Sequence, residues 1–184
     1  MDLLEPLSRT FDLTTGVLAG VRPDQLDEPT PCTEWDVRTL VAHTIGVVTN
    51  MGRGARGERL LDEVNAVPLE ADLQAQFRTE ADRTLAAWRA RGLDGMVDVG
   101  GGPMPVTAAL SVNLVDTTTH SWDIARATAQ DPSLPDELAA TVLAVGRGFV
   151  TDQIRALVGI DPPISLADGA SPTDQLVAFL GRRA

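Results

Sequence analysis

The 184-residue chain contains no lysine and no tyrosine, so all 15 of its basic side chains are arginines. We interpret this bias as the codon usage of a GC-rich genome and not as chemistry. Acidic side chains number 26, which gives a formal net charge of -11. Nucleic-acid binding needs clustered Lys and Arg to meet the phosphates, so this charge argues against a nucleic-acid partner.

Cysteine and long apolar runs are equally scarce. The single cysteine, Cys32, cannot form an internal disulfide, so nothing supports an oxidising compartment. The opening MDLLEPLSRTFDL has acidic residues where a signal peptide needs a basic segment and an apolar run. Polar residues interrupt every apolar run before the ~18 residues that a membrane span requires. We therefore expect a cytoplasmic protein with no membrane and no nucleic-acid partner.

Hydrophobic residues make up 43% of the chain, enough for a sizeable core in one globular domain. Their dominant period is helical. Leu3, Leu7, Phe11 and Leu18 belong to a series with mostly three- and four-residue steps, which predicts an amphipathic helix ending near Gly20.

The same period predicts helices along the rest of the chain. Thr33 and Asp36 have the spacing of a capping box before an apolar run, which predicts a second helix over residues 34–51. The segment MVDVGGGPMPV alternates like a strand around three glycines and predicts a short β-hairpin or an extended loop. We expect further helices over residues 70–91, 107–129, 136–158 and 172–180.

Gly52, Gly54 and Gly57 form the pattern GxGxxG. The pattern follows a predicted helix instead of a strand, and no βαβ unit surrounds it, so it does not indicate a dinucleotide site. We interpret these glycines as a flexible, solvated crossover that ends the second helix.

Four long helices with an extended connection after the second predict an all-α fold, a four-helix bundle with a long crossover connection. The bundle should span about residues 1–130. Extra C-terminal helices over about 131–184 are expected to pack outside it, within a single domain of residues 1–184.

The chain has two histidines. His43 lies in the second predicted helix, and His120 lies in the fourth, four residues after Asp116. Asp116 and His120 therefore leave one helix face about 6 Å apart along the axis, where both can bind one metal ion. Asn113 and Asp123 extend this polar face. Burying unpaired polar groups costs roughly a few kcal/mol each, so the face needs partners, solvent or a ligand.

Two interpretations of this face remain open. His43, Asp116 and His120 would hold a metal ion with three ligands from two helices, leaving the open position of a catalytic or exchangeable site. Alternatively, His120 is a core histidine bonded to Asp116, and His43 is unrelated. Asp123 would either orient a ligating histidine by a hydrogen bond or pair with Arg126 on the same helix.

Cys32 stands eleven residues before His43, about 16 Å along a helix axis at 1.5 Å per residue. We therefore expect it outside the metal site, so that a thiol for chemistry would come from a soluble molecule. A reactive thiol at a helix N-terminus is the alternative to a buried structural cysteine. Trp35 is predicted to pack structurally.

Three segments carry a family resemblance: PTPCTEWDVRTLVAH, DTTTHSWDIARA and SPTDQLVAFLGRR. Together they resemble the actinobacterial DinB/YfiT-like metal-binding family and are similar to the N-terminal domain of mycothiol-dependent maleylpyruvate isomerase, over nearly the whole chain. The resemblance implies a four-helix bundle with a long crossover. It also implies a divalent metal, zinc or nickel, held by His43, Asp116 and His120. The isomerase has Glu at the position of Asp116, one methylene longer.

The resemblance leaves three functional hypotheses. The first is a metal-dependent thiol transferase or isomerase, in which the ion activates a mycothiol-type thiol toward a small electrophile. The second is a non-catalytic metal-binding module, and the third is a structural bundle with incidental histidines. A monomer and a homodimer are both compatible with the sequence. Candidate cationic partners of the thiol, or else solvated surface charges, are Arg53, Arg56, Arg59, Arg182 and Arg183.

Overall fold

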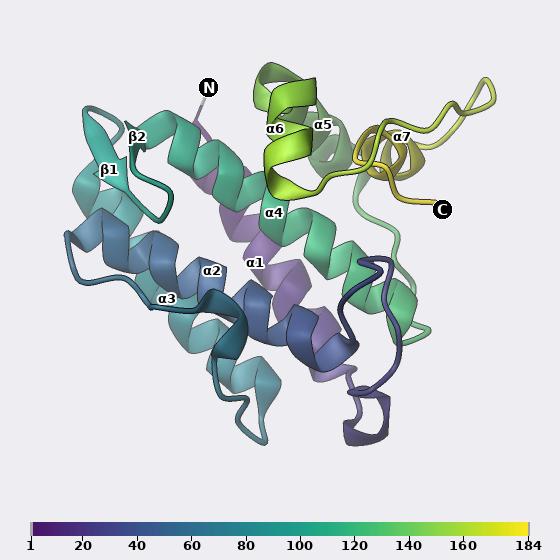
Figure 1. Cartoon of the computed structure of the whole chain (residues 1–184), viewed down its shortest axis with the longest axis horizontal. Coiled ribbons are helices and arrows are strands. Elements are labelled where there is room, and N and C mark those ends of the chain that lie inside the picture. The colour runs from purple at the N-terminus through teal and green to yellow at the C-terminus, as the bar shows by residue number, and fades with distance from the viewer. Residues whose placement is uncertain (1, 184) are drawn as a thin grey trace. The chain divides into compact units, whose positions relative to one another are not determined.

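A computed structural model describes residues 2–183, and in this range the chain has seven α-helices and one two-stranded sheet (Figure 1). The predicted all-α class is therefore confirmed. The chain divides into two compact units, Met1–Asp131 and Pro132–Ala184. Among the described helices, none is both long enough and apolar enough to cross a membrane.

The first unit is a four-helix bundle. It consists of α1 (Leu4–Ala19), α2 (Val37–Arg56), α3 (Leu73–Arg91) and α4 (Val106–Ala127). Both α1 and α2 pack against α3 and α4, so α1 and α2 occupy diagonal corners. The connection over residues 57–72 returns along α2, and α2 and α3 consequently run in the same direction (Figure 1). This connection is the predicted long crossover.

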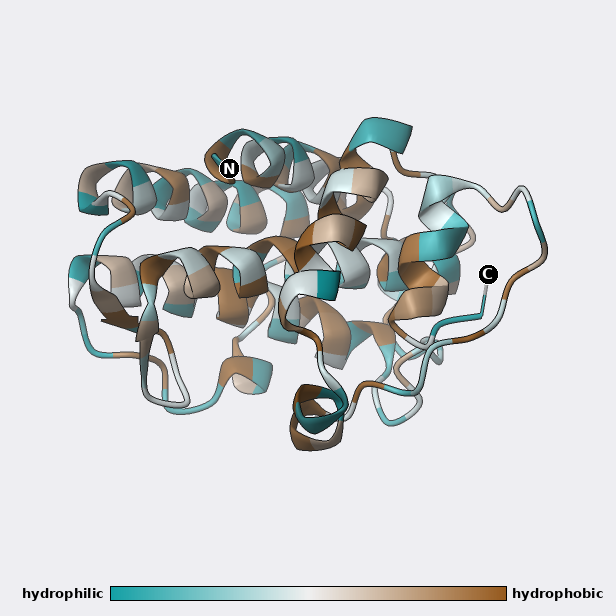
Figure 2. Ribbon diagram, turned by 90° about the horizontal axis from the view of Figure 1, so that it is seen from above, coloured by the Kyte–Doolittle hydropathy of each residue, from teal (hydrophilic) through white to brown (hydrophobic). Residues whose placement is uncertain are grey.

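Each bundle helix buries an apolar face, and each alternates apolar with polar residues along its length (Figure 2). Phe11, Ile45, Trp88 and Leu114 contribute one almost fully buried side chain from each of the four helices. Phe11 meets Phe77 edge to face, with ring centroids 5.8 Å apart. Removal of this apolar surface from water is the main force that holds the bundle together.

The start of α2 differs from the prediction. The helix begins at Val37, and Asp36 is its N-cap, whose carboxylate accepts a 2.8 Å hydrogen bond from the Thr39 N–H. Thr33 lies in the preceding turn, so the predicted capping box is wrong. Asp36 has an extended backbone and forms an isolated bridge with Pro29, which folds the preceding connection back on itself.

α2 also continues through two of the glycines that were expected to end it. Gly52 and Gly54 are buried inside the helix, and the chain leaves the helix at Gly57, which has a positive φ of 68°. A Cβ at Gly52 would lie 2.4 Å from Thr84 Oγ1, and one at Gly54 would lie 2.3 Å from the carbonyl oxygen of Asp98. Close approach of α3 and the hairpin therefore requires glycine here, despite its low helix propensity.

The β-hairpin is confirmed between α3 and α4. Strands β1 (Met96–Asp98) and β2 (Pro103–Pro105) pair antiparallel, with Val97 opposite Met104.

The second unit contains α5 (Asp136–Phe149), α6 (Asp152–Val158) and α7 (Pro172–Phe179), and α5 packs against α7. The single helix predicted over 136–158 is wrong. Thr151 interrupts it, because its side chain caps α6 by accepting a 3.3 Å hydrogen bond from the Ile154 N–H.

Candidate functional site

Asp116 lies between the two histidine rings, where α2 packs against α4. Its Oδ1 is 3.6 Å from His43 Nε2 and 3.5 Å from His120 Nε2. The donor atoms of the three residues all lie within 4.8 Å of one another, and the ring centroids of the two histidines are 5.0 Å apart. The fold thus brings together the three residues that the sequence singled out as a group.

The second carboxylate oxygen of Asp116 is buried and has no hydrogen-bond partner among the described residues. Burial by itself would raise the pKa of Asp116, but the charge of His120 and the polar contacts with both rings outweigh it and lower that pKa. Asp116 is therefore an ionised carboxylate with one oxygen that the protein does not use. A buried oxygen of this kind is costly unless a ligand satisfies it.

The distances around Asp116 fit a shared metal ion. A direct N–H···O hydrogen bond usually measures about 2.7–3.2 Å, shorter than the 3.5 and 3.6 Å observed here. Ligands bound tetrahedrally at about 2.0–2.1 Å stand about 3.3 Å apart, which is closer to the observed values. Two imidazoles and a carboxylate are also a donor set that zinc and nickel accept.

A residue of the crossover connection holds the ring of His43 in place. Its Nδ1 donates a 2.7 Å hydrogen bond to the Oδ1 of Asn65, in the short 3-10 helix η2 (Val64–Ala66). A proton on Nδ1 leaves the lone pair on Nε2, the nitrogen that faces Asp116. Sequence reasoning missed Asn65, since it stands in an irregular segment with no periodic pattern.

His120 is held by its own helix. Its Nδ1 lies 3.1 Å from the Oδ2 of Asp123, which is fully buried. Burial would lower the pKa of His120, but the charge of Asp116 and polar contacts with Asp116, Asp123 and Cys32 raise it well above its usual value. The contact places Asp123 where a residue that orients His120 would stand. Arg126 was the other partner considered for Asp123. Its guanidinium lies over the Trp122 ring, 5.7 Å from the ring centroid.

Cys32 is much closer to the histidines than expected. Its Sγ lies 3.3 Å from Asp123 Oδ2 and 3.8 Å from His120 Nδ1. The predicted separation of about 16 Å is wrong because it extended the α2 axis back through Cys32. The helix begins only at Val37, and the turn before it folds back toward α4.

Trp35 and Asn113 both make contacts that the sequence did not specify. The Trp35 ring packs on the candidate ligands, with its centroid 4.5 Å from that of His43 and 6.0 Å from that of His120. Asn113 instead belongs to the core, where its side chain accepts from Trp88 Nε1 and donates to Thr117 Oγ1. On the polar face of α4, Asn113 therefore has its hydrogen-bond partners in the core, whereas Asp116, His120 and Asp123 lie at the candidate site.

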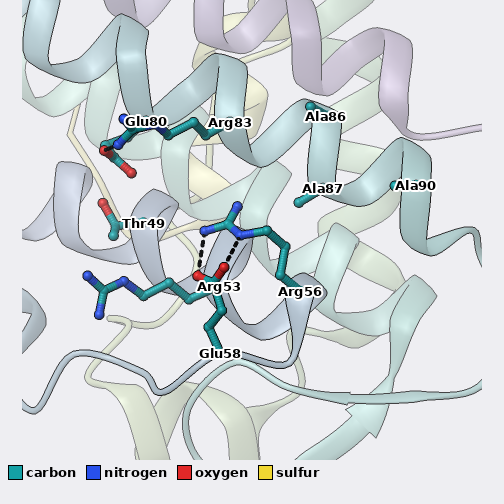
Figure 3. A pocket seen from close by; sticks show the side chains of 9 residues that line it. All are labelled: Thr49, Arg53, Arg56, Glu58, Glu80, Arg83, Ala86, Ala87 and Ala90. Atoms are coloured by element: carbon teal, nitrogen blue, oxygen red, sulfur yellow. Dashed lines mark hydrogen bonds and ion pairs between the residues drawn. The ribbon is translucent and has the colours of Figure 1, made fainter.

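A groove of about 620 Å³ lies between α2 and α3, and the two histidines and Asp116 do not line it (Figure 3). Arg56 donates two hydrogen bonds to Glu58, of 2.7 and 2.9 Å, and Arg83 donates one of 2.8 Å to Glu80. These guanidinium groups are paired with carboxylates on the surface. We therefore place the candidate site at the histidines, where the donor atoms converge.

The fold and the site define a four-helix bundle with a histidine–carboxylate cluster between its second and fourth helices. The family model of the mycothiol maleylpyruvate isomerase N-terminal domain matches residues 7–125, and the chain belongs to this family. The matched segment contains all three residues of the cluster.

Two relatives come from Mycobacterium tuberculosis, from strains CDC 1551 / Oshkosh and H37Rv, and both are described as uncharacterized proteins. Each is 33% identical over an alignment of 194 positions, which covers 99% of this chain and 98% of the relative. No solved structure matches the chain significantly.

Proposed function

We propose that the protein binds a divalent metal ion, zinc or nickel, through His43, Asp116 and His120. The observation that carries this proposal is the position of Asp116 between two Nε2 atoms, with its other oxygen buried and unused. We further propose a mycothiol-type thiol-dependent transfer or isomerisation of a small electrophile. The name of the family, which refers to a mycothiol-dependent isomerase, supports the thiol.

Hydrogen bonds with neighbouring side chains orient the two histidine rings for metal binding. Asn65 accepts from His43 Nδ1, and Asp123 accepts from His120 Nδ1, so that both Nε2 atoms face one space. Trp35 covers the rings and limits access of water from its side. Three protein ligands leave a coordination position for a further ligand. A bound divalent ion would lower the pKa of a thiol in that position and make its thiolate available near neutral pH.

Metal analysis of protein purified without a histidine tag tests the binding. We expect one equivalent of zinc or nickel in the wild type and less than a tenth of an equivalent in His120→Ala. Asp94→Asn, at an exposed position in the turn after α3, is the matched control and should keep the metal. A folded wild-type protein that stays metal-free after reconstitution with both ions would contradict the proposal.

Cobalt substitution tests the thiol. Addition of mycothiol to the cobalt protein should change its visible spectrum, because a thiolate ligand adds charge-transfer bands, whereas the matching alcohol should not. An unchanged spectrum at saturating thiol would refute thiol activation while leaving metal binding in place.

A further inference from the structure

The ring of His120 separates two groups of donor atoms. Its Nε2 faces Asp116, while its Nδ1 faces Cys32 and Asp123. The second group joins a residue of the connection before α2 to two residues of α4. We propose that Cys32, His120 Nδ1 and Asp123 form a second metal position, which prefers thiophilic divalent ions such as zinc and cadmium.

The distances between these three atoms are those of a metal site. Zinc binds sulfur at about 2.3 Å and nitrogen or oxygen at about 2.0–2.2 Å. In tetrahedral geometry, a sulfur ligand then lies about 3.6 Å from a nitrogen or oxygen ligand, and a nitrogen ligand lies about 3.3 Å from an oxygen ligand. The observed separations are 3.8 Å for Sγ–Nδ1, 3.3 Å for Sγ–Oδ2 and 3.1 Å for Nδ1–Oδ2. The atoms therefore already stand within about 0.3 Å of the required spacing.

Charge also favours a divalent ion here. Asp123 is fully buried, His120 is 8% exposed and Cys32 is half-buried. A thiolate and a carboxylate together neutralise a 2+ ion, which lowers the cost of burying it. The thiolate is the soft ligand that distinguishes this position from the histidine–carboxylate group on the other side of the ring.

The two positions exclude each other. A neutral imidazole has one lone pair, so an ion at Nδ1 requires the ring proton to move to Nε2. Asp116 Oδ1 lies 3.5 Å from that nitrogen, so its negative charge would stabilise a proton there. Binding at the second position therefore displaces the thiol proton of Cys32 and removes His120 from the first position. The inference shares His120 with the proposed function but does not depend on it.

X-ray absorption spectroscopy at the metal edge tests the second position directly. Cys32 is the chain's only cysteine, so a zinc–thiolate distance of about 2.3 Å in full-length protein kept free of small thiols must come from it. The decisive variant is Asp116→Asn, which removes a ligand of the first position and keeps the three ligands of the second. Loaded with one equivalent of zinc, it should show the sulfur distance, and the double variant Asp116→Asn with Cys32→Ser should not.

The outcomes separate this inference from the proposed function. Zinc bound to Asp116→Asn with nitrogen and oxygen ligands alone would overturn the second position, whatever the wild type binds. Metal in the wild type that is lost in His43→Ala would still support the first position. A cadmium titration of the unaltered wild type guards against misfolded variants, since cadmium–thiolate absorption should rise in the near ultraviolet. No such absorption at saturating cadmium would also overturn the inference.

Discussion

The carbonyl oxygen of Val64 lies directly against Gly46, so close that a Cβ on Gly46 would stand 2.1 Å from it. Gly46 is three residues beyond His43 on α2, and Val64 is the residue before Asn65. This contact lets the crossover connection pass tightly over α2, which places the Asn65 side chain on the ring of His43. One glycine on a helix face therefore connects the path of a loop to the orientation of a candidate ligand.

Substitution of this glycine should destabilise the protein. Gly46→Ala forces its methyl group into backbone, which cannot rotate away, and we expect a loss of about 1–3 kcal/mol in the free energy of unfolding. Gly16→Ala, on an open face of α1 with no atom near the added Cβ, is the matched control and should gain about 0.5–1 kcal/mol. Urea denaturation measures both. Equal effects of the two substitutions would show that Val64 moves aside freely.

Asn65→Ala should weaken metal binding without unfolding the protein. The residue is exposed, but its hydrogen bond selects the His43 tautomer that offers Nε2, and loss of such a bond typically costs about 10–100-fold in metal affinity. Competition with a chromophoric chelator measures the affinity. Glu63→Ala, exposed in the same connection, is the control and should bind normally. Identical affinities for the two variants would exclude a positioning role for Asn65.

Asp123→Ala should cost stability even without metal. The substitution leaves the Nδ1–H of His120 and the thiol of Cys32 without the buried carboxylate that accepts from both. We expect a loss of about 1–3 kcal/mol in thermal or urea unfolding of metal-free protein. Asp94→Ala, at an exposed position in the turn after α3, should cost less. A neutral effect of Asp123→Ala would mean that water replaces the carboxylate.

The cap of α2 should give a pH-dependent contribution to stability. Hydrogen bonds from Thr39 lower the pKa of Asp36 in the folded protein below its usual 3.8. A depressed folded-state pKa stabilises the fold above the unfolded pKa, and this stabilisation disappears as the pH falls through the folded value.

Asp36→Ala should therefore lose about 1 kcal/mol at pH 7, while its difference from the wild type shrinks below pH 3.8. Asp36→Asn keeps an acceptor for the helix and should lose less at pH 7. Unfolding free energies at several pH values test the sign. A difference that grows toward acid pH would contradict the assignment.

The sequence predicts the positions of side chains within helices better than the ends of helices and the connections between them. Asp116 and His120 could be paired from the sequence, since four residues along one helix return a side chain to the same face. Gly52 and Gly54 misled the prediction of the helix end, because glycine's low propensity is a local property. The approach of α3 and the hairpin, which favours glycine there, comes from residues distant in the chain.

Local periodicity was enough to predict the bundle helices, the long connection after the second helix and the spacing of the His/Asp pair, because each follows from residues close together in the sequence. The positions of Cys32, Trp35 and Asn65 depended on tertiary structure. All three stand in connections whose backbone follows no repeating pattern, and their conformations are set by packing against helices distant in sequence. The helices thus brought the histidines together, and the folded connections supplied the side chains that surround them.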